Sequence, residues 1–261
     1  MKAGKIIDFI EDYAPKSLAM EWDHVGLMLG SVENEIHNVY FCMDFTIETL
    51  HEALRKNCNL IITHHPLIWN PLASVSDDTP EGSLIAESVR AGITVYSAHT
   101  NLDFTAGGIN DALISAIGLD GIPDDSGTHR YGTLVSPITF SAFLDNVREA
   151  LDAPSARGVL PLGADFDDVI TTVGVSSGAF DGDIDWLREC NIDVIVTGEM
   201  KHNQAIELMN NGFFAITAGH FESEHPGVEM LADAVKKHFA EIFEKEGIKT
   251  VVSKACNPFV D

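Results

Sequence analysis

Basic residues are scarce in this chain of 261 residues. It has 16 Lys and Arg against 40 Asp and Glu, which gives a formal net charge of −24 at pH 7, and its longest basic run is the pair Lys236-Lys237. A protein of this charge repels nucleic acid and anionic membrane surfaces unless a local basic patch overrides the net charge. The sequence offers no such patch. We therefore expect neither nucleic acid nor a membrane as a partner.

Cysteines and long apolar runs are also few. Cys42, Cys58, Cys190 and Cys256 are far apart and form no CxxC pair, which argues against a zinc ribbon or a disulfide framework. We expect them to be reduced and mostly buried. No apolar run reaches the roughly 18 residues that a membrane span needs, and acids interrupt residues 1–12, where a signal peptide needs an apolar region. The sequence thus predicts a soluble, cytoplasmic protein.

Predicted strands and helices alternate along the chain, which is typical of an α/β fold. Tandem repeats are absent from the sequence. Apolar runs predict strands at 39–43, 60–62, 93–98, 169–175, 194–196 and 213–217. Helical spacing and caps predict helices at 2–13, 44–56, 141–151 and 184–190, one that ends near residue 90 and one that begins at 109. Another helix is predicted near the C-terminus, with an apolar face of Val228, Leu231, Val235, Phe239 and Ile242. Ser176-Ser177-Gly178 is expected to be a turn.

Histidines follow three of the predicted strands at the point where each strand ends. His64 and His65 come directly after an apolar strand, and Pro66 marks its end because proline cannot donate to a sheet ladder. His99 and His220 follow two other strands in the same way. Ligands of open α/β sheets bind at the carboxyl ends of the strands. We therefore expect these imidazoles to lie at a binding site.

Together with two carboxylates, these imidazoles suit a pair of divalent ions. Imidazole and carboxylate are ligands for Zn, Fe or Mn, and the donor set does not decide among these metals. Five side chains are enough for two ions about 3.5–4 Å apart when a carboxylate bridges them. The candidate ligands are His64, His65, Asp103, His220 and Glu224.

Each candidate ligand also has an ordinary structural interpretation. A single histidine at a strand end is often a hydrogen-bonded surface residue, and Asp103 also fits an N-cap or a turn. Glu224 would share a helix face with His220, four residues earlier, but Pro226 disfavours helical geometry at His225. We therefore expect a turn from His220 to His225, a geometry that still permits joint ligation.

Six motifs in chain order resemble those of the family called NIF3-like, whose members are often named GTP cyclohydrolase 1 type 2. The motifs are Glu21-Trp22-Asp23-His24-Val25-Gly26-Leu27, Thr63-His64-His65-Pro66, His99-Thr100-Asn101-Leu102-Asp103, Gly107-Gly108-Ile109-Asn110-Asp111, Thr197-Gly198-Glu199 and Gly219-His220-Phe221-Glu222-Ser223-Glu224. The match spans nearly the whole chain. It departs from the family at His24, where Asn is usual, and at Ser176-Ser177-Gly178, where the family has a more glycine-rich turn.

The resemblance implies a dinuclear metal centre, with two divalent ions per chain ligated by the five candidate residues. It also implies a homohexameric ring with the metal sites facing an internal cavity, and a fold of two similar α/β lobes. We expect residues 1–125 to form the first lobe, completed by 213–261, and residues 126–212 to form the second. Ligands near 64 and 220 can meet only if the chain returns to the first lobe, and residues 121–133 are rich in Gly, Asp, Ser and Pro, as a boundary would be.

Three functional hypotheses follow from this pattern. The first is metal-assisted hydrolysis of a small molecule or nucleotide, with His99 and Glu199 as candidates for proton transfer or for orienting a ligand. The name of the family suggests ring opening of GTP, although no P-loop with its lysine is present. The second is a metal-binding assembly protein that stores, senses or delivers ions, or regulates a partner. The third is a structural α/β protein with coincidental histidines.

Overall fold

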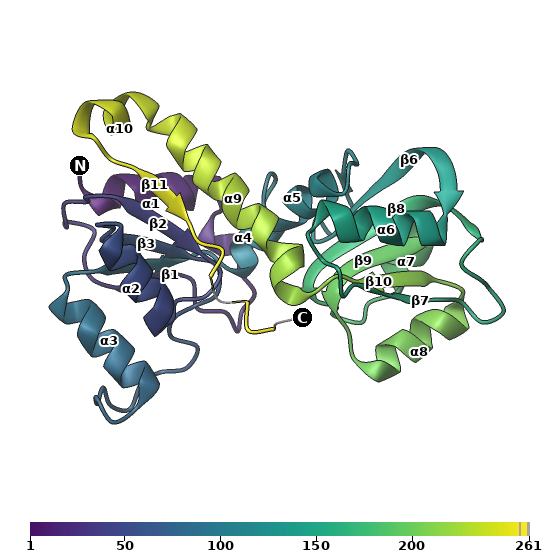
Figure 1. The fold of residues 1–261 in the computed structure, drawn as a ribbon, viewed down its shortest axis with the longest axis horizontal. Helices are drawn as coiled ribbons and strands as arrows, with labels where there is room; N and C mark the ends of the chain where they lie inside the picture. Colours follow the sequence, from purple (N-terminus) through teal and green to yellow (C-terminus); the bar gives the residue numbers. More distant parts are fainter. Residues whose placement is uncertain (256, 260–261) are drawn as a thin grey trace. The chain divides into compact units, whose positions relative to one another are not determined.

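The computed structural model describes residues 1–255 and 257–259 as two compact α/β units (Figure 1). The N-terminal unit comprises Met1–Thr105 with residues 228–255 and 257–259, and the middle unit comprises Ala106–Gly227. The α/β class with two similar lobes is confirmed. The chain leaves the N-terminal unit and returns to it, but the divisions fall after Thr105 and Gly227, whereas the sequence suggested 125 and 212.

The N-terminal unit is built on a five-stranded sheet. In spatial order its strands are β1 (Gly26–Leu29), β4 (Thr94–Ser97), β3 (Leu60–Thr63), β2 (Val39–Cys42) and β11 (Thr250–Val252). Neighbouring strands from β4 to β11 are parallel, and β1 is the antiparallel edge. Its helices are α1 (Ala3–Tyr13), η1 (Lys16–Leu18), α2 (Ile47–Arg55), α3 (Pro80–Arg90), α4 (Thr100–Phe104), α10 (Ala240–Glu246) and the later part of α9 (His220–His238).

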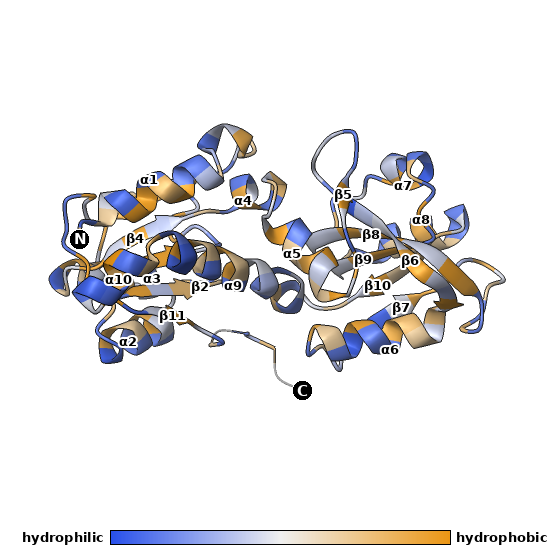
Figure 2. Ribbon diagram, turned by 90° about the horizontal axis from the view of Figure 1, so that it is seen from above, coloured by the Kyte–Doolittle hydropathy of each residue, from blue (hydrophilic) through white to orange (hydrophobic). Residues whose placement is uncertain are grey.

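Helices cover both faces of this sheet. The apolar residues of α2 and α3 pack against alternate residues of β2, β3 and β4, and α1 lies on the other face with the later part of α9 (Figure 1). Apolar and polar residues alternate along α1 in Figure 2, as an amphipathic helix requires. Thr46 begins α2 with a capping box, because its hydroxyl accepts from the Thr49 backbone while the Thr49 side chain accepts from the Thr46 backbone.

The middle unit has a six-stranded sheet with a parallel centre. The order is β5 (Ile122–Pro123), β6 (Arg130–Thr139), β8 (Val169–Ala179), β9 (Val194–Glu199), β10 (Phe214–Thr217) and β7 (Arg157–Val159). Strands β8, β9 and β10 are parallel, and β6 and β7 pair antiparallel with them. The remaining helices are α5 (Ile109–Ala116), α6 (Phe140–Ala150), α7 (Asp185–Glu189) and α8 (His202–Asn211).

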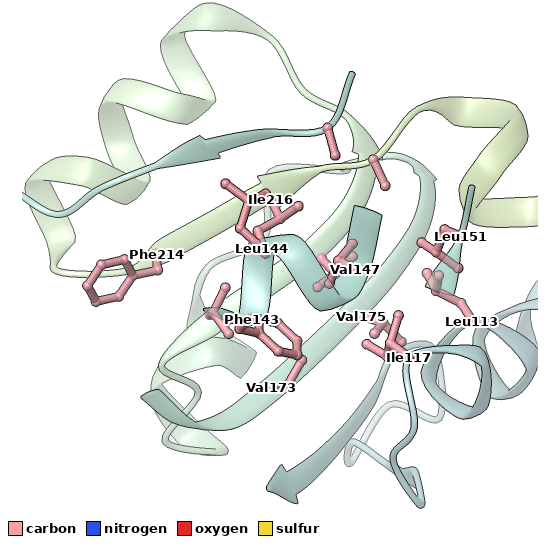
Figure 3. Packing of buried hydrophobic residues seen from close by; sticks show 14 of the residues in the cluster. Leu113, Ile117, Phe143, Leu144, Val147, Leu151, Val173, Val175, Phe214 and Ile216 are labelled. Atoms are coloured by element: carbon pink, nitrogen blue, oxygen red, sulfur yellow. The ribbon is translucent and has the colours of Figure 1, made fainter. Parts of the chain in front are cut away.

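Apolar clusters fill both faces of this second sheet. Figure 3 shows Phe143 and Val147 of α6 facing Val173 and Val175 of β8. On the opposite face, side chains of α7 and α8 pack against β9 and β10. Helix α5 belongs to the first of these clusters through residues such as Leu113. The middle unit therefore begins earlier than the composition of residues 121–133 suggested, because α5 packs against its sheet.

A buried histidine in the middle unit lies between two carboxylates. His129 Nδ1 donates to Asp124 Oδ2 at 3.1 Å, its Nε2 lies 3.4 Å from Asp181 Oδ2, and its ring stacks on Trp186 at 4.3 Å. Burial by itself lowers the pKa of His129, but hydrogen bonds to Asp181 and Asp124 outweigh it and raise the pKa. Burial raises the pKa of Asp124 and Asp181, yet hydrogen bonds, including those from His129, bring both below their ordinary value. The histidine and the two carboxylates thus stabilise each other's charged forms.

Three local predictions are wrong. Ser176-Ser177-Gly178 is the end of β8, where a bulge follows Ser176 and Gly178 has a φ of +61°. The segment expected as a turn is the start of α9, which begins at His220 and contains Pro226. The single C-terminal helix is divided at Phe239, between α9 and α10. In α9, the hydrogen bonds of Ser223 with Gly178 and His220 hold the first turn and outweigh the tendency of Pro226 to disfavour a helix.

The structure also bears on the cysteines, on membrane-spanning helices and on the strands that the sequence did not predict. Cys42 and Cys58 are buried, Cys190 is partly exposed, and Cys256 lies outside the described residues. Within the described part of the chain, none of the helices combines the length and the apolarity that a bilayer crossing demands. The strands β1, β5, β6, β7 and β11 were not predicted, because they are short or partly exposed and carry no fully buried apolar run.

Candidate metal centre

Parallel strands β3 and β4 bring three histidines together at one edge of the N-terminal sheet. Thr63 pairs with Ser97 at the ends of these strands, so His64, His65 and His99 follow at the same edge. One ring nitrogen from each of these histidines lies within 4.8 Å of the other two. The predicted meeting of imidazoles at adjacent strand ends is therefore present in the N-terminal unit.

The hydrogen bonds of these histidines fix the same tautomer in each. Nδ1 of His64 lies 3.0 Å from the carbonyl oxygen of Ala98, and Nδ1 of His65 lies 2.8 Å from Asp44 Oδ1. Nδ1 of His99 lies 3.0 Å from a carboxylate oxygen of Asp23. Carbonyl and carboxylate oxygens only accept, so Nδ1 carries a proton in each histidine, and Nε2 is the nitrogen available to a metal or a second proton. This is the arrangement of histidines that ligate metals.

Asp103 adds a carboxylate to the same edge. It lies on the short helix α4, which follows β4, and its Oδ1 is 3.5 Å from Nε2 of His64. The imidazole of His64 is fully buried and the side chain of Asp103 is 15% exposed. The N-terminal unit thus assembles His64, His65 and Asp103 beside His99.

In the middle unit, β9 and β10 supply a second group of donors. These strands are parallel, and Glu199 ends β9 while His220 follows β10. Nδ1 of His220 lies 3.2 Å from Glu199 Oε1, and its Nε2 lies 3.1 Å from Glu224 Oε2, one helical turn further along α9. His220 thus lies between two carboxylates, with Nδ1 facing Glu199 and Nε2 facing Glu224.

The first turn of α9 is held by β8. The backbone N–H of Gly178 donates to the hydroxyl of Ser223 at 3.0 Å, and that hydroxyl donates to the carbonyl of His220. A Cβ placed on Gly178 would lie 2.2 Å from Oε1 of Glu224. Because Gly178 has no Cβ, the Glu224 carboxylate can lie against its backbone.

The donor set fits divalent ions. Where Nδ1 carries the proton, Nε2 and the facing carboxylate oxygen are both acceptors, so a proton or a cation must lie between them. Two ligands of one tetrahedral zinc, each about 2.0–2.1 Å from the ion, are about 3.3 Å apart. The separations of 3.5 Å at His64 and 3.1 Å at His220 match this spacing. Each unit thus contains a nitrogen and oxygen pair that suits a metal.

A buried carboxylate supports His99. The side chain of Asp23 is fully buried and accepts from His99, from the Thr100 backbone at 3.0 Å and from the Thr100 hydroxyl at 2.5 Å. Burial raises the pKa of Asp23, but the hydrogen bonds from His99 and Thr100 outweigh it, and the pKa falls to about 2. Asp23 is therefore ionised and fixes the ring of His99.

Three residues beside these histidines could not be assigned to the site from the sequence. Asp44 directly precedes the predicted helix, but Thr46 caps α2 and Asp44 holds His65. Asp23 belongs to a family motif whose function the sequence does not reveal, and Trp69 belongs to none of the motifs. A carboxylate at the end of the strand next to that of His65 was the available signal for Asp44, because β2 and β3 end at the same edge.

Comparisons with known proteins agree with the fold and the motifs. The model of the family described as Duf34/NIF3 (NGG1p interacting factor 3) matches residues 1–258. The proteins named GTP cyclohydrolase 1 type 2 homolog of Clostridium acetobutylicum and Clostridium perfringens are each 31% identical, over 98% and 99% of this chain and 96% and 99% of theirs. Among solved structures, hypothetical protein SA1388 of Staphylococcus aureus matches with a TM-score of 0.91 and 24% identity, over 100% of this chain and 99% of that one.

Proposed function

The chain belongs to the Duf34/NIF3 family, and we propose that it is a metal-dependent hydrolase that binds two divalent ions per chain. The proposed ligands are His64, His65, Asp103, His220 and Glu224. Zn, Fe and Mn are all candidate ions, because imidazole and carboxylate ligands suit all three. We also propose a cytoplasmic location, because reduced thiols such as that of Cys58 persist there.

The orientation of the histidines carries this proposal. His64 and His65 donate Nδ1–H to an oxygen acceptor, which leaves Nε2 to bind a metal, and His220 lies between the carboxylates of Glu199 and Glu224. A surface histidine needs no such support, whereas a metal ligand gains affinity from it. The two carboxylates supply the negative charge that a pair of dications requires.

Divalent ions at these ligands would supply Lewis-acid polarisation of a substrate and activation of water. Among the chain's own residues, Asp23 orients His99, whose Nε2 is then directed to the same edge as His64. Glu199 is half-exposed and contacts His220. We propose that His99 and Glu199 either transfer a proton or orient a neighbouring metal ligand.

Relatives named GTP cyclohydrolase 1 type 2 homolog support a small molecule or a nucleotide as the substrate. Family resemblance further supports a homohexamer, which light scattering would detect as six times the mass of the chain. The alternative function is that of a metal-binding or regulatory assembly protein without catalysis.

Elemental analysis of desalted, metal-loaded protein tests the metal site. We expect about two ions per chain for the parent, with marked loss in Asp103→Ala and in Glu224→Ala. Glu241→Ala, an exposed acid on α10, is the matched control and should retain the ions. A parent that retains no ions after loading with zinc, iron or manganese would refute the proposal.

Turnover separates the hydrolase from the alternative. Metal-loaded and chelator-stripped protein are compared on a panel of nucleotides, and turnover that needs the metal supports the hydrolase. Tightly retained ions without turnover across the panel would favour the assembly protein. With His99→Gln and Glu199→Gln, loss of turnover at unchanged metal content indicates proton transfer, whereas loss of metal indicates an orienting role.

A further inference from the structure

Two half-exposed tryptophans lie beside the strand-end histidines of the N-terminal unit. The ring of Trp22 stands edge-on to that of His99, with centroids 5.9 Å apart and planes at 70°. The ring of Trp69 does the same at 5.3 Å and 81°, and it also lies 6.2 Å from the ring of His65. Trp22 is 57% exposed and Trp69 is 47% exposed. A large apolar surface therefore faces water at the candidate metal centre.

The third tryptophan, Trp186, is buried, unlike Trp22 and Trp69. Trp186 is 4% exposed and lies parallel to His129, with an interplanar angle of 3°. It serves the packing of the middle unit, whereas Trp22 and Trp69 leave much of their rings uncovered. Because Trp22 and Trp69 are 57% and 47% exposed, they keep ring surface available for another aromatic group.

The charges beside these rings narrow the chemistry of that group. Among the described hydrogen bonds and ion pairs, the carboxylates of Asp44, Asp23 and Asp103 contact the three strand-end histidines. The proposed divalent ions would offset these carboxylates, so the preference comes from the tryptophan faces, whose negative charge favours a neutral or cationic ring over an anionic ring.

We infer that Trp22 and Trp69 form a stacking surface for the flat heteroaromatic ring of a neutral or cationic substrate of nucleobase size. The inference rests on the proposed function, since the metal ligands would fix the reacting end of the same molecule. Aromatic side chains bind bases through their faces, and removing one such contact weakens binding about 5- to 150-fold. The two tryptophans thus determine which substrates the centre accepts.

Tryptophan fluorescence tests this inference directly. The chain has three tryptophans, so Trp186→Phe leaves only Trp22 and Trp69 as reporters without touching the site. In that background, guanosine, adenosine and cytidine supply a ring without phosphate, and ribose 5-phosphate supplies a phosphate without a ring. We expect at least one nucleoside to quench the emission and ribose 5-phosphate to have no effect.

Substitutions then assign the effect to the two rings. Trp22→Leu and Trp69→Leu should each weaken nucleoside binding about 5- to 150-fold, measured by calorimetry, while Trp22→Phe, which keeps a ring, retains most of it. Metal content by elemental analysis should stay at the parent value, and circular dichroism verifies the fold. Equal affinity in parent and both leucine variants would overturn the inference.

The outcomes distinguish this inference from the proposed function. Metal-loaded protein that binds none of the nucleosides overturns the stacking surface and leaves the metal function standing. Nucleoside binding that depends on both tryptophans in a protein that retains no metal supports the stacking surface and tells against the metal function. Binding of ribose 5-phosphate as tightly as a nucleoside overturns the stacking surface, because phosphate alone then accounts for recognition.

Discussion

Gly178→Ala is the substitution for which the structure gives the sharpest expectation. A Cβ at this position would lie 2.2 Å from Oε1 of Glu224, and real Cβ contacts are essentially never under 3.0 Å, so the carboxylate must retreat by about 0.8 Å. Metal–ligand distances tolerate a change of only about 0.2 Å. We therefore expect metal affinity to fall by at least the roughly 10- to 100-fold that follows loss of a ligand's supporting partner.

Gly212→Ala is a matched control. Gly212 ends α8 with a φ of +86°, and a Cβ there meets nothing within 4 Å. Gly178 also has a left-handed backbone, with a φ of +61°. Both alanine variants thus carry a backbone strain of about 1–2 kcal/mol, which lowers the melting temperature by about 2–4 °C per kcal/mol in a chain of this size. Only Gly178→Ala should lose metal.

Two measurements separate strain from ligation. Melting temperatures are recorded with a chelator present, so that metal binding does not add to stability, and the two variants should then fall by similar amounts. Metal retention is measured by competition with a chelator at constant ion concentration. If Gly178→Ala holds metal as tightly as Gly212→Ala, the position of the Glu224 carboxylate beside Gly178 does not matter for binding and the reasoning fails.

Two further predictions concern the support of His65 and the buried charges around His129. Asp44→Ala should weaken metal binding about 10- to 100-fold in chelator competition, whereas Glu48→Ala, an exposed acid on α2, should not; equal affinities would contradict the role of Asp44. His129 has a raised pKa, so its stabilisation is full below its ordinary value near 6.5 and is lost as pH rises through the raised value. His129→Gln should thus lower the melting temperature more at pH 5.5 than at pH 9, with a loss in free energy of unfolding of about 1.5–3 kcal/mol at the lower pH. Equal losses at both pH values would refute this.

The sequence was most informative where buried apolar strands are followed by polar residues. Parallel strands end at a common edge, so His64, His65 and His99 could be expected to meet once their strands were recognised. The five candidate ligands were chosen from strand ends and donor chemistry, and the family resemblance implied the same set, which stays a prediction for each of its residues. The tautomers could not be predicted, because they depend on distant partners such as Ala98 and Asp23.

The errors have physical causes in tertiary contacts. Pro226 disfavours a helix by its local effect, yet α9 includes it, since Gly178 and Ser223 hold the first turn. The edge strand β7 is only three residues long and partly exposed, so no apolar alternation marks it. The Asp124, His129 and Asp181 cluster joins segments more than 50 residues apart, and spacing alone gave no sign of it.

The return of the chain to the N-terminal unit sets an order of events during synthesis on the ribosome. Strand β11 pairs with β2, and the Ser253 hydroxyl donates to the Glu52 carboxylate that also accepts from Tyr40. The sheet that positions His64 therefore stays one strand short until β11 has emerged. The contiguous middle unit has all its strands well before then, so it can finish folding first.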